Sequence, residues 1–332
     1  MAAKPSVGRN SGAPAPEAKG GLTPAQLSVS PALFRKFQKL VYAETGIWLG
    51  PSKTALLCGR LYRRLVTLGI PTLDRYFECV SAPDGREELA RMIDAITTNE
   101  TRFFREPRQF DFLLERVIAR WLRDAVEGQR SKRVRVWSAG CSSGEEPYSL
   151  AMLLSKHLPA DDGWDVRLLA TDISNRVLEK ARKGVYDVER SKDIPKDLLR
   201  RFMLRGFNDC QGQMKVQNTI QQMVEFRHLN LSQEPYAVQG PYDVILCRNV
   251  LIYFDAASKQ KVVSNLISHL AGEGFLFVGH AENLSNLSSQ VRSVEPSIYT
   301  RKGAKAERAA RTPDAEPESS EKGNAIGASA GR

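Results

Sequence analysis

The stretch VWSAGCSSGEEPYSL, residues 136–150, decides the fold class of this chain. It begins as an apolar, β-prone run, passes through a turn with Gly140 and Gly144, and enters a pattern that predicts a helix over residues 147–158. A strand, a small turn and a helix in this order let backbone approach a nucleotide or nucleoside closely. The glycine spacing matches neither the dinucleotide nor the triphosphate motif, and a turn without any ligand is equally compatible with it.

Strand and helix patterns alternate along the rest of this region. This alternation predicts an α/β, Rossmann-like domain with a mostly parallel sheet and helices on both faces. We expect strands at residues 134–138, 166–170, 224–230, 244–247 and 275–278, helices at 175–183 and 257–270, and a long helix at 107–127 before the first strand. Residues 186–222 interrupt the alternation and predict a small inserted antiparallel β-subdomain, with a helix that ends at residues 200–205.

Apolar residues recur at helical spacing before the sheet region, which predicts an all-α N-terminal domain over residues 28–98, with the Rossmann-like domain over 99–302. Its second helix is expected to start with Ser52 as N-cap. Residues 1–27 and 303–332 are rich in Ala, Gly, Pro, Ser and Glu, have no hydrophobic period, and are predicted to be disordered tails.

The composition excludes several classes of protein. The 332 residues contain no apolar run of roughly 20 residues, so we expect no membrane insertion and a cytoplasmic location. Five cysteines without a CxxC pair and only four histidines argue against a disulfide framework or a metal site. The net charge of +10 is concentrated in residues 31–70, which contain seven basic residues and one acidic residue, so an acidic partner is expected there.

Asp172 ends the second predicted strand, in LLATDIS. An acid at that position hydrogen-bonds ribose hydroxyls in Rossmann-like folds. Asp172 could instead cap the following helix. The turn and the acid together favour an adenosine-type ligand, and S-adenosylmethionine fits because it carries ribose without phosphate.

Six segments carry a resemblance to a known family. They are TTNETRFFRE (residues 97–106), SAGCSSGEEPYSLA, ATDIS, HLNL, YDVILCRNVLIYFD and GHAENL, in this order. Over residues 31–302 the chain resembles the CheR-type chemoreceptor glutamate O-methyltransferases. The resemblance implies methylation of glutamate side chains on the cytoplasmic helical domains of chemoreceptors, with S-adenosylmethionine as methyl donor and S-adenosylhomocysteine as product.

The resemblance also implies which residues contact the cofactor. They are Asn99, Thr101, Arg105, Glu146, Asp172, Asn230, Leu231, Arg248 and Asn249. The chemistry agrees for three of them, because the methionine carboxylate needs a cation such as Arg105, its ammonium needs an acceptor such as Glu146, and the ribose needs Asp172. A surface ion pair for Arg105 and a first-turn helix acid for Glu146 are the alternatives. Phe103 and Phe104 are expected to pack.

The predicted mechanism needs no general base, because a glutamate with a pKa near 4.3 is already ionised at neutral pH. The enzyme must place the carboxylate oxygen in line with the methyl carbon and the sulfur of the cofactor, and must remove water from around the carboxylate. Arg105 and Tyr253 are the expected catalytic residues, by orienting the incoming carboxylate.

Four basic residues are predicted to dock the acidic receptor helices: Lys53, Arg60, Arg63 and Arg64. An ordinary solvated helix face is the alternative. The loop at residues 206–216 resembles the longer form found in family members that also bind a receptor's C-terminal peptide, although its glycine pattern differs.

Two rival functions remain. A nucleic-acid methyltransferase would suit the net charge, but CRNVLIYF stands where a (D/N)PPY-type motif is expected, Cys247 does not follow a proline, and stacking aromatics are missing from the basic stripe. We therefore expect no nucleic-acid partner. The second rival function is a cofactor-binding scaffold without catalytic activity, which would not need all the predicted site residues.

Overall fold

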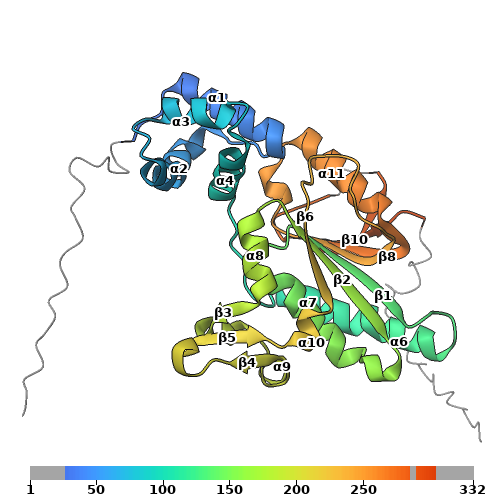
Figure 1. Ribbon diagram of the computed structural model, residues 1–332. Helices are drawn as coiled ribbons and strands as arrows, with labels where there is room; N and C mark the ends of the chain where they lie inside the picture. Colours follow the sequence, from blue (N-terminus) through green and yellow to red (C-terminus); the bar gives the residue numbers. More distant parts are fainter. Residues whose placement is uncertain (1–26, 285–288, 304–332) are drawn as a thin grey trace, which may run out of the picture. The chain divides into compact units, whose positions relative to one another are not determined.

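A computed structural model describes residues 27–284 and 289–303 of the chain (Figure 1). They divide into two compact units: residues up to Asn99 together with Ile173–Arg176, and Glu100–Asp172 together with the residues from Val177 onward. The predicted disordered tails lie outside the described residues, except for Leu27 and Gly303 at their inner ends. Leu27 is 9% exposed and packs in the helical core, so packed structure begins one residue earlier than predicted.

The first unit is all-α, as predicted. It consists of α1 (Pro31–Thr45), α2 (Thr54–Leu68), α3 (Leu73–Ser81) and α4 (Arg86–Ile96). Ser30 caps α1, because its Oγ accepts a hydrogen bond from Leu33 N at 3.1 Å. The prediction that Ser52 caps the second helix is wrong: a 3₁₀ turn, η2 (Pro51–Lys53), precedes α2, and no side chain caps its first turn.

The second unit contains a seven-stranded sheet in the order β6-β2-β1-β7-β8-β10-β9. The five parallel strands are those predicted: β1 (Arg133–Ala139), β2 (Asp165–Asp172), β6 (Val224–His228), β7 (Tyr242–Cys247) and β8 (Leu270–Val278). Two antiparallel strands were not predicted: β9 (Val291–Glu295) and β10 (Ile298–Arg301). Both are short, and among the described residues no helix separates them from their neighbouring strands, so the alternation of strand and helix patterns does not reveal them.

Helices cover both faces of this sheet (Figure 1). One face packs on α7 (Glu145–His157) and on the helical segment before β1, and the other on α11 (Ala256–Ser268). The helix α8 (Asn175–Lys183) follows β2. The predicted extension of α11 to residue 270 is wrong, because Leu270 already begins β8. None of the helices within the described ranges is long and apolar enough to cross a bilayer.

The predicted long helix at 107–127 exists in three consecutive parts. They are α5 (Pro107–Phe112), a π-helical stretch η3 (Leu113–Ile118) and α6 (Ala119–Val126). Glu106, just before Pro107, has a left-handed backbone with φ 59°. A proline disfavours the right-handed helical region for the residue before it, so the helix begins sharply at Pro107.

The predicted insertion is a three-stranded antiparallel sheet in the order β3-β5-β4. Its elements are β3 (Val185–Asp187), η5 (Val188–Asp193), α9 (Lys196–Phe202), β4 (Met203–Arg205), η6 (Asn208–Cys210), β5 (Gln213–Val216) and α10 (Asn218–Gln221). The predicted helix end within residues 200–205 is confirmed, because α9 ends at Phe202, and residues 203–205 then pair with β5. Two further 3₁₀ turns are η4 (Ala160–Asp162) and η7 (Leu251–Tyr253).

Candidate functional site

The candidate site lies at the carboxyl ends of β2, β1 and β7, which are neighbours in the sheet. Ligands of open α/β sheets bind at this edge. The turn after β1 is held against β2, since Gly140 N and Cys141 N both donate to Thr171 O, at 2.7 and 2.9 Å. Gly140 has φ 83°, and a Cβ there would lie 2.3 Å from a methyl carbon of Val250. Only glycine fits the turn at this position.

Asp172 stands at the tip of β2 and is 8% exposed. Its Oδ2 accepts a hydrogen bond from Ser142 N at 2.8 Å, so the carboxylate fixes the turn that follows β1. The Asp172 carboxylate therefore holds the end of β2 and the turn after β1 together.

A buried cluster around Arg248 forms the second part of the site. Arg248, directly after β7, is 5% exposed. Its Nη1 lies 3.2 Å from Glu146 Oε2, its Nη2 lies 3.2 Å from Glu106 Oε2, and Nη2 also donates to the carbonyl oxygen of Arg105. One guanidinium therefore joins three segments: the first turn of α7, the FFRE motif and the end of β7.

Glu146 receives a second hydrogen bond, from Ser138 Oγ to its Oε1 at 2.7 Å. Burial raises the pKa of Glu146, while the nearby Arg248 and the Ser138 hydrogen bond counteract that rise. Because both Nη atoms of Arg248 bond protein oxygens, Arg248 organises the carboxylates of this cluster.

Glu282 lies in the GHAENL segment, and no role was predicted for it. It is 6% exposed and accepts three backbone hydrogen bonds, from Gly279 N at 2.6 Å, Asn249 N at 2.9 Å and Ile252 N at 3.1 Å. Asn249 itself has a left-handed backbone with φ 59°. The loops after β7 and β8 are thus fixed by one carboxylate. The available signal was an acid three residues after a glycine that follows a strand.

Arg190 and Glu145 were also missed. Arg190, in the inserted subdomain, pairs with the fully buried Glu145 at 2.6 Å and donates to the carbonyl oxygen of Thr101 at 3.1 Å. Burial raises the pKa of Glu145, although Ser143 and Arg190 stabilise its charged form. The pair ties the insertion to α7 and to the TTNETRFFRE segment. The sequence offered no signal, because the partners are 45 residues apart.

The other residues of TTNETRFFRE have different surroundings. Phe103 is 1% exposed and its ring centroid lies 5.0 Å from that of Tyr186, while Phe104 packs on Phe110, so both phenylalanines pack as predicted. Arg105 Nη1 donates to Glu100 O at 3.1 Å. Asn99 belongs to the helical unit and donates to Thr97 Oγ1 at 3.4 Å. Asn99 and the residues around Asp172 and Arg248 thus belong to different units.

The remaining predicted residues lie after β6 and β7. Asn230 Oδ1 accepts hydrogen bonds from the amide and hydroxyl of Ser232, and Leu231 is 7% exposed. Tyr253 is half-buried at the end of η7. Within the described part of the chain, no hydrogen bond or ring contact joins Tyr253 to Arg105.

The predicted docking residues on α2 divide into two pairs. Arg64 forms a two-point ion pair with Glu88, and Arg60 Nη1 donates to the carbonyls of Ala95 and Thr97 at the end of α4. Lys53 and Arg63 are exposed. Two of the four cations therefore hold the helical unit together, and two face solvent.

Two family models match the chain: the CheR methyltransferase all-alpha domain over residues 32–97, and the CheR methyltransferase SAM binding domain over residues 99–300. The chain belongs to the CheR methyltransferase family. Similar proteins include chemotaxis protein methyltransferase 2 of Pseudomonas aeruginosa, 39% identical over 80% of this chain and 92% of that protein. The chemotaxis protein methyltransferases of Salmonella typhimurium and Escherichia coli are each 38% identical over 82% of this chain, and over 91% and 92% of their own lengths.

Membership in the CheR family confirms the predicted fold class and enzyme class. The chain is an S-adenosylmethionine-dependent methyltransferase of the chemotaxis type, with an all-α domain before a Rossmann-like domain. The roles of single residues remain predictions.

Proposed function

We propose that the chain transfers a methyl group from S-adenosylmethionine to glutamate side chains on the cytoplasmic helical domains of chemoreceptors, and so acts in the cytoplasm. The observation that carries this proposal is a pair of largely buried carboxylates: Asp172 at the end of β2, and Glu146 in the first turn of α7, where it accepts a hydrogen bond from Ser138 of β1. Both belong to a chain whose two halves match the two domains of a chemotaxis methyltransferase.

The donor groups of S-adenosylmethionine fit these residues. Its ammonium and ribose hydroxyls need acceptors, which Glu146 and Asp172 supply. The Gly140 turn, where a Cβ would clash with Val250, allows the backbone to come close to a ligand. Since both Nη atoms of Arg248 already bond Glu146, Glu106 and the Arg105 carbonyl, we assign Arg248 to the support of Glu146 rather than to the methionine carboxylate. Arg105 is the proposed cation for that carboxylate.

S-adenosylmethionine supplies a methyl group on a positively charged sulfur, so the reaction forms a carbon–oxygen bond and breaks a carbon–sulfur bond. The glutamate arrives ionised at neutral pH and needs no base. The chain's contribution is to hold the carboxylate oxygen in line with the methyl carbon and to exclude water. Tyr253 is proposed to orient the carboxylate by donating one hydrogen bond, which reduces its nucleophilicity less than an ion pair would.

Receptor docking is proposed to use the exposed cations of α2. Lys53 and Arg63 are available for an acidic helix, whereas Arg60 and Arg64 are engaged within the helical unit. Attraction between exposed charges is screened by salt, so docking through them should weaken at high ionic strength. A receptor's C-terminal peptide is a further proposed partner of the inserted subdomain, where Leu204 and Phe207 are 49% and 74% exposed.

The proposal is tested by incubating the chain with radiolabelled S-adenosylmethionine and a chemoreceptor cytoplasmic fragment. Protein-bound label that is released by mild base is expected, because carboxyl methyl esters hydrolyse under those conditions. Stable label on protein or on added nucleic acid would contradict it. Arg105→Ala is expected to weaken cofactor binding and methyl transfer together, and unchanged kinetics would remove Arg105 from the site.

A further inference from the structure

The inserted subdomain contacts the turn that follows β1. Tyr186, the middle residue of β3, is 2% exposed, and its hydroxyl donates to the carbonyl oxygen of Ser143 at 2.7 Å. Ser143 follows Ser142, whose amide is held by Asp172 at the tip of β2. The turn is therefore fixed from two directions, by the parallel sheet and by the insertion.

There is little free space between this turn and β3. A Cβ on Gly144, which has φ 96°, would lie 2.9 Å from the hydroxyl oxygen of Tyr186 and 2.9 Å from Cβ of Ala181. The ring of Tyr186 also packs against Phe103 of the TTNETRFFRE segment, with the ring centroids 5.0 Å apart. Close-packed groups transmit displacements to their neighbours, so a shift of β3 displaces the turn.

Arg190 makes a second connection between the insertion and the turn. Its Nη1 lies 2.6 Å from Glu145 Oε1 and donates to the carbonyl oxygen of Thr101 at 3.1 Å. The other carboxylate oxygen of Glu145 accepts a hydrogen bond from Ser143 Oγ at 2.7 Å. Because Glu145 is fully buried, its charge depends on these partners.

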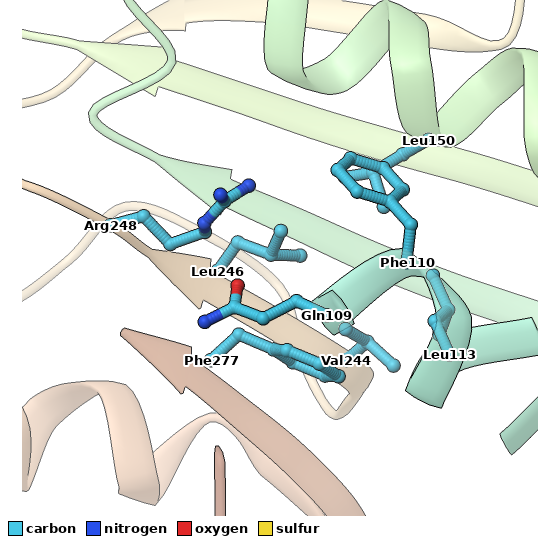
Figure 2. Close-up of a pocket in the computed structure, with 8 residues that line it drawn as sticks. All are labelled: Gln109, Phe110, Leu113, Leu150, Val244, Leu246, Arg248 and Phe277. Carbon is cyan, nitrogen blue, oxygen red and sulfur yellow. The ribbon is translucent and has the colours of Figure 1, made fainter. Parts of the chain in front are cut away.

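Glu145 and Glu146 are adjacent in the first turn of α7, but they pair with arginines from different parts of the chain. Arg248, directly after β7, pairs with Glu146, whereas Arg190, in the insertion, pairs with Glu145. Figure 2 shows the sheet side of α7, where Arg248 and Leu150 line the same small pocket. The backbone of this first turn, and with it the direction of the Glu146 carboxylate, therefore depends on both arginines.

We infer that Tyr186 and Arg190 are positioning residues for the cofactor, because they hold the turn after β1 and the first turn of α7 in the geometry that binds S-adenosylmethionine. The inserted subdomain then contributes to cofactor binding independently of any contact with a receptor. The effect on the cofactor rests on the proposed function, since Glu146 and Asp172 are the proposed acceptors, but it does not depend on the receptor.

The first test compares two buried tyrosines by calorimetric titration with S-adenosylhomocysteine. Tyr186→Phe leaves the Ser143 carbonyl without its donor and is expected to weaken binding about tenfold. Tyr148→Phe is the matched control, because the Tyr148 hydroxyl is also buried and donates to a backbone carbonyl, that of Ala181, at 2.8 Å. This control should bind within about twofold of the wild type. Equal affinities for the two variants would overturn the positioning role of Tyr186.

Urea unfolding of the same two variants separates positioning from a general loss of stability. Each variant loses one buried hydrogen bond to a backbone carbonyl, so the two should lose similar free energies of unfolding. A lower cofactor affinity of Tyr186→Phe at similar stability is expected. If the loss of affinity instead follows the loss of stability in both variants, Tyr186 is only structural and the inference is overturned.

The second test determines whether Arg190 acts through Glu145. Arg190→Gln and Glu145→Gln are each expected to weaken S-adenosylhomocysteine binding, and the double variant should bind no more weakly than Arg190→Gln alone. Lys192→Gln, at an exposed position of the same 3₁₀ segment, removes an equal charge and should leave the affinity unchanged. Losses that add in the double variant, or an unchanged affinity of Arg190→Gln, would overturn the role of Arg190.

Both tests measure cofactor binding, which needs no receptor. A wild-type chain that binds S-adenosylhomocysteine but methylates no chemoreceptor fragment would contradict the proposed function and leave the roles of Tyr186 and Arg190 supported. Variants that bind as tightly as the wild type would overturn those roles, whatever the methylation assay shows.

Discussion

The cofactor end of the sheet and the basic face of α2 differ in what their arginines do. At the sheet, Arg248 is buried and pairs with Glu146, and the carboxylates are the groups proposed to contact the ligand. On α2, Arg64 holds Glu88 and Arg60 holds the end of α4, leaving Lys53 and Arg63 exposed. In both regions, arginines that pair with protein oxygens hold the structure together. We propose that recognition depends on the charged groups that remain accessible.

The largest effect on stability is expected at Gly140, because a side chain at this position would clash with Val250. Gly140→Ala places a Cβ 2.3 Å from Val250 at a positive φ, so it should lower the free energy of unfolding by about 3 kcal/mol. Gly128→Ala is the matched control, because Gly128 also has a positive φ (70°) but open space around it, and should cost about 1 kcal/mol. Urea unfolding measures both. Equal losses would show that crowding in the turn is unimportant.

The next prediction compares how a buried carboxylate and an exposed one affect cofactor affinity. Glu146→Gln removes the charged acceptor and should weaken S-adenosylmethionine binding roughly 30-fold, since a hydrogen bond to a charged group contributes about 2 kcal/mol. Glu179→Gln makes the same charge change on the exposed surface of α8 and should have no effect. Calorimetric titration compares them. Similar affinities for both variants would remove Glu146 from the cofactor site.

A smaller effect is expected where an arginine stabilises the helical unit. Glu88→Gln leaves Arg64 without its ion partner and should cost about 2 kcal/mol at neutral pH. Glu87→Gln, on the same helix but in an exposed pair, should cost under about 0.5 kcal/mol. Urea unfolding of the full chain gives both values, and equal costs would contradict the scaffold role of Arg64.

The Glu88 contribution also has a defined pH dependence. Burial alone would raise the pKa of Glu88, but the hydrogen bonds from Arg64 and Tyr76 outweigh it and the pKa is lowered from 4.5. An acid with a lowered folded-state pKa stabilises above its unfolded pKa, and that stabilisation is lost as the pH falls. The stability gap between the wild type and Glu88→Gln should therefore be full at pH 7 and shrink once the pH drops below 4.5. A gap that stays constant would contradict the ion pair.

The smallest effect is expected at the exposed cations of α2. Lys53→Glu with Arg63→Glu should raise the KM for the receptor on the order of fivefold at low salt, and the difference should vanish at high salt. Arg133→Glu with Lys261→Glu makes the same charge change at exposed positions of the sheet unit and serves as the control. If both double variants behave alike, net charge rather than a docking surface accounts for the effect.

The sequence predicted most of the fold because strand and helix periodicity is local. The five parallel strands, the all-α unit and the insertion all followed from it. The short antiparallel strands β9 and β10 did not, since the pairing of β10 with β8 and of β9 with β10 depends on contacts between strands.

The site was predicted less completely. Sequence position indicated that Asp172 stands at a strand end and Glu146 at a helix N-terminus, but it could not show which hydrogen-bond donors a charged side chain finds. The sequence therefore did not show that Arg248, Arg60 and Arg64 have partners within the protein. Glu282, Glu145 and Arg190 were missed because they act through backbone amides or through partners distant in the chain.

The central claim is tested most directly by locating the transferred methyl group. The chain is incubated with isotope-labelled S-adenosylmethionine and a chemoreceptor cytoplasmic fragment, and the labelled peptides are sequenced by mass spectrometry. The account predicts label on glutamate side chains as methyl esters, abolished when the labelled glutamate is replaced by alanine. Label on lysine or arginine nitrogen, or no label on the receptor fragment, would contradict it.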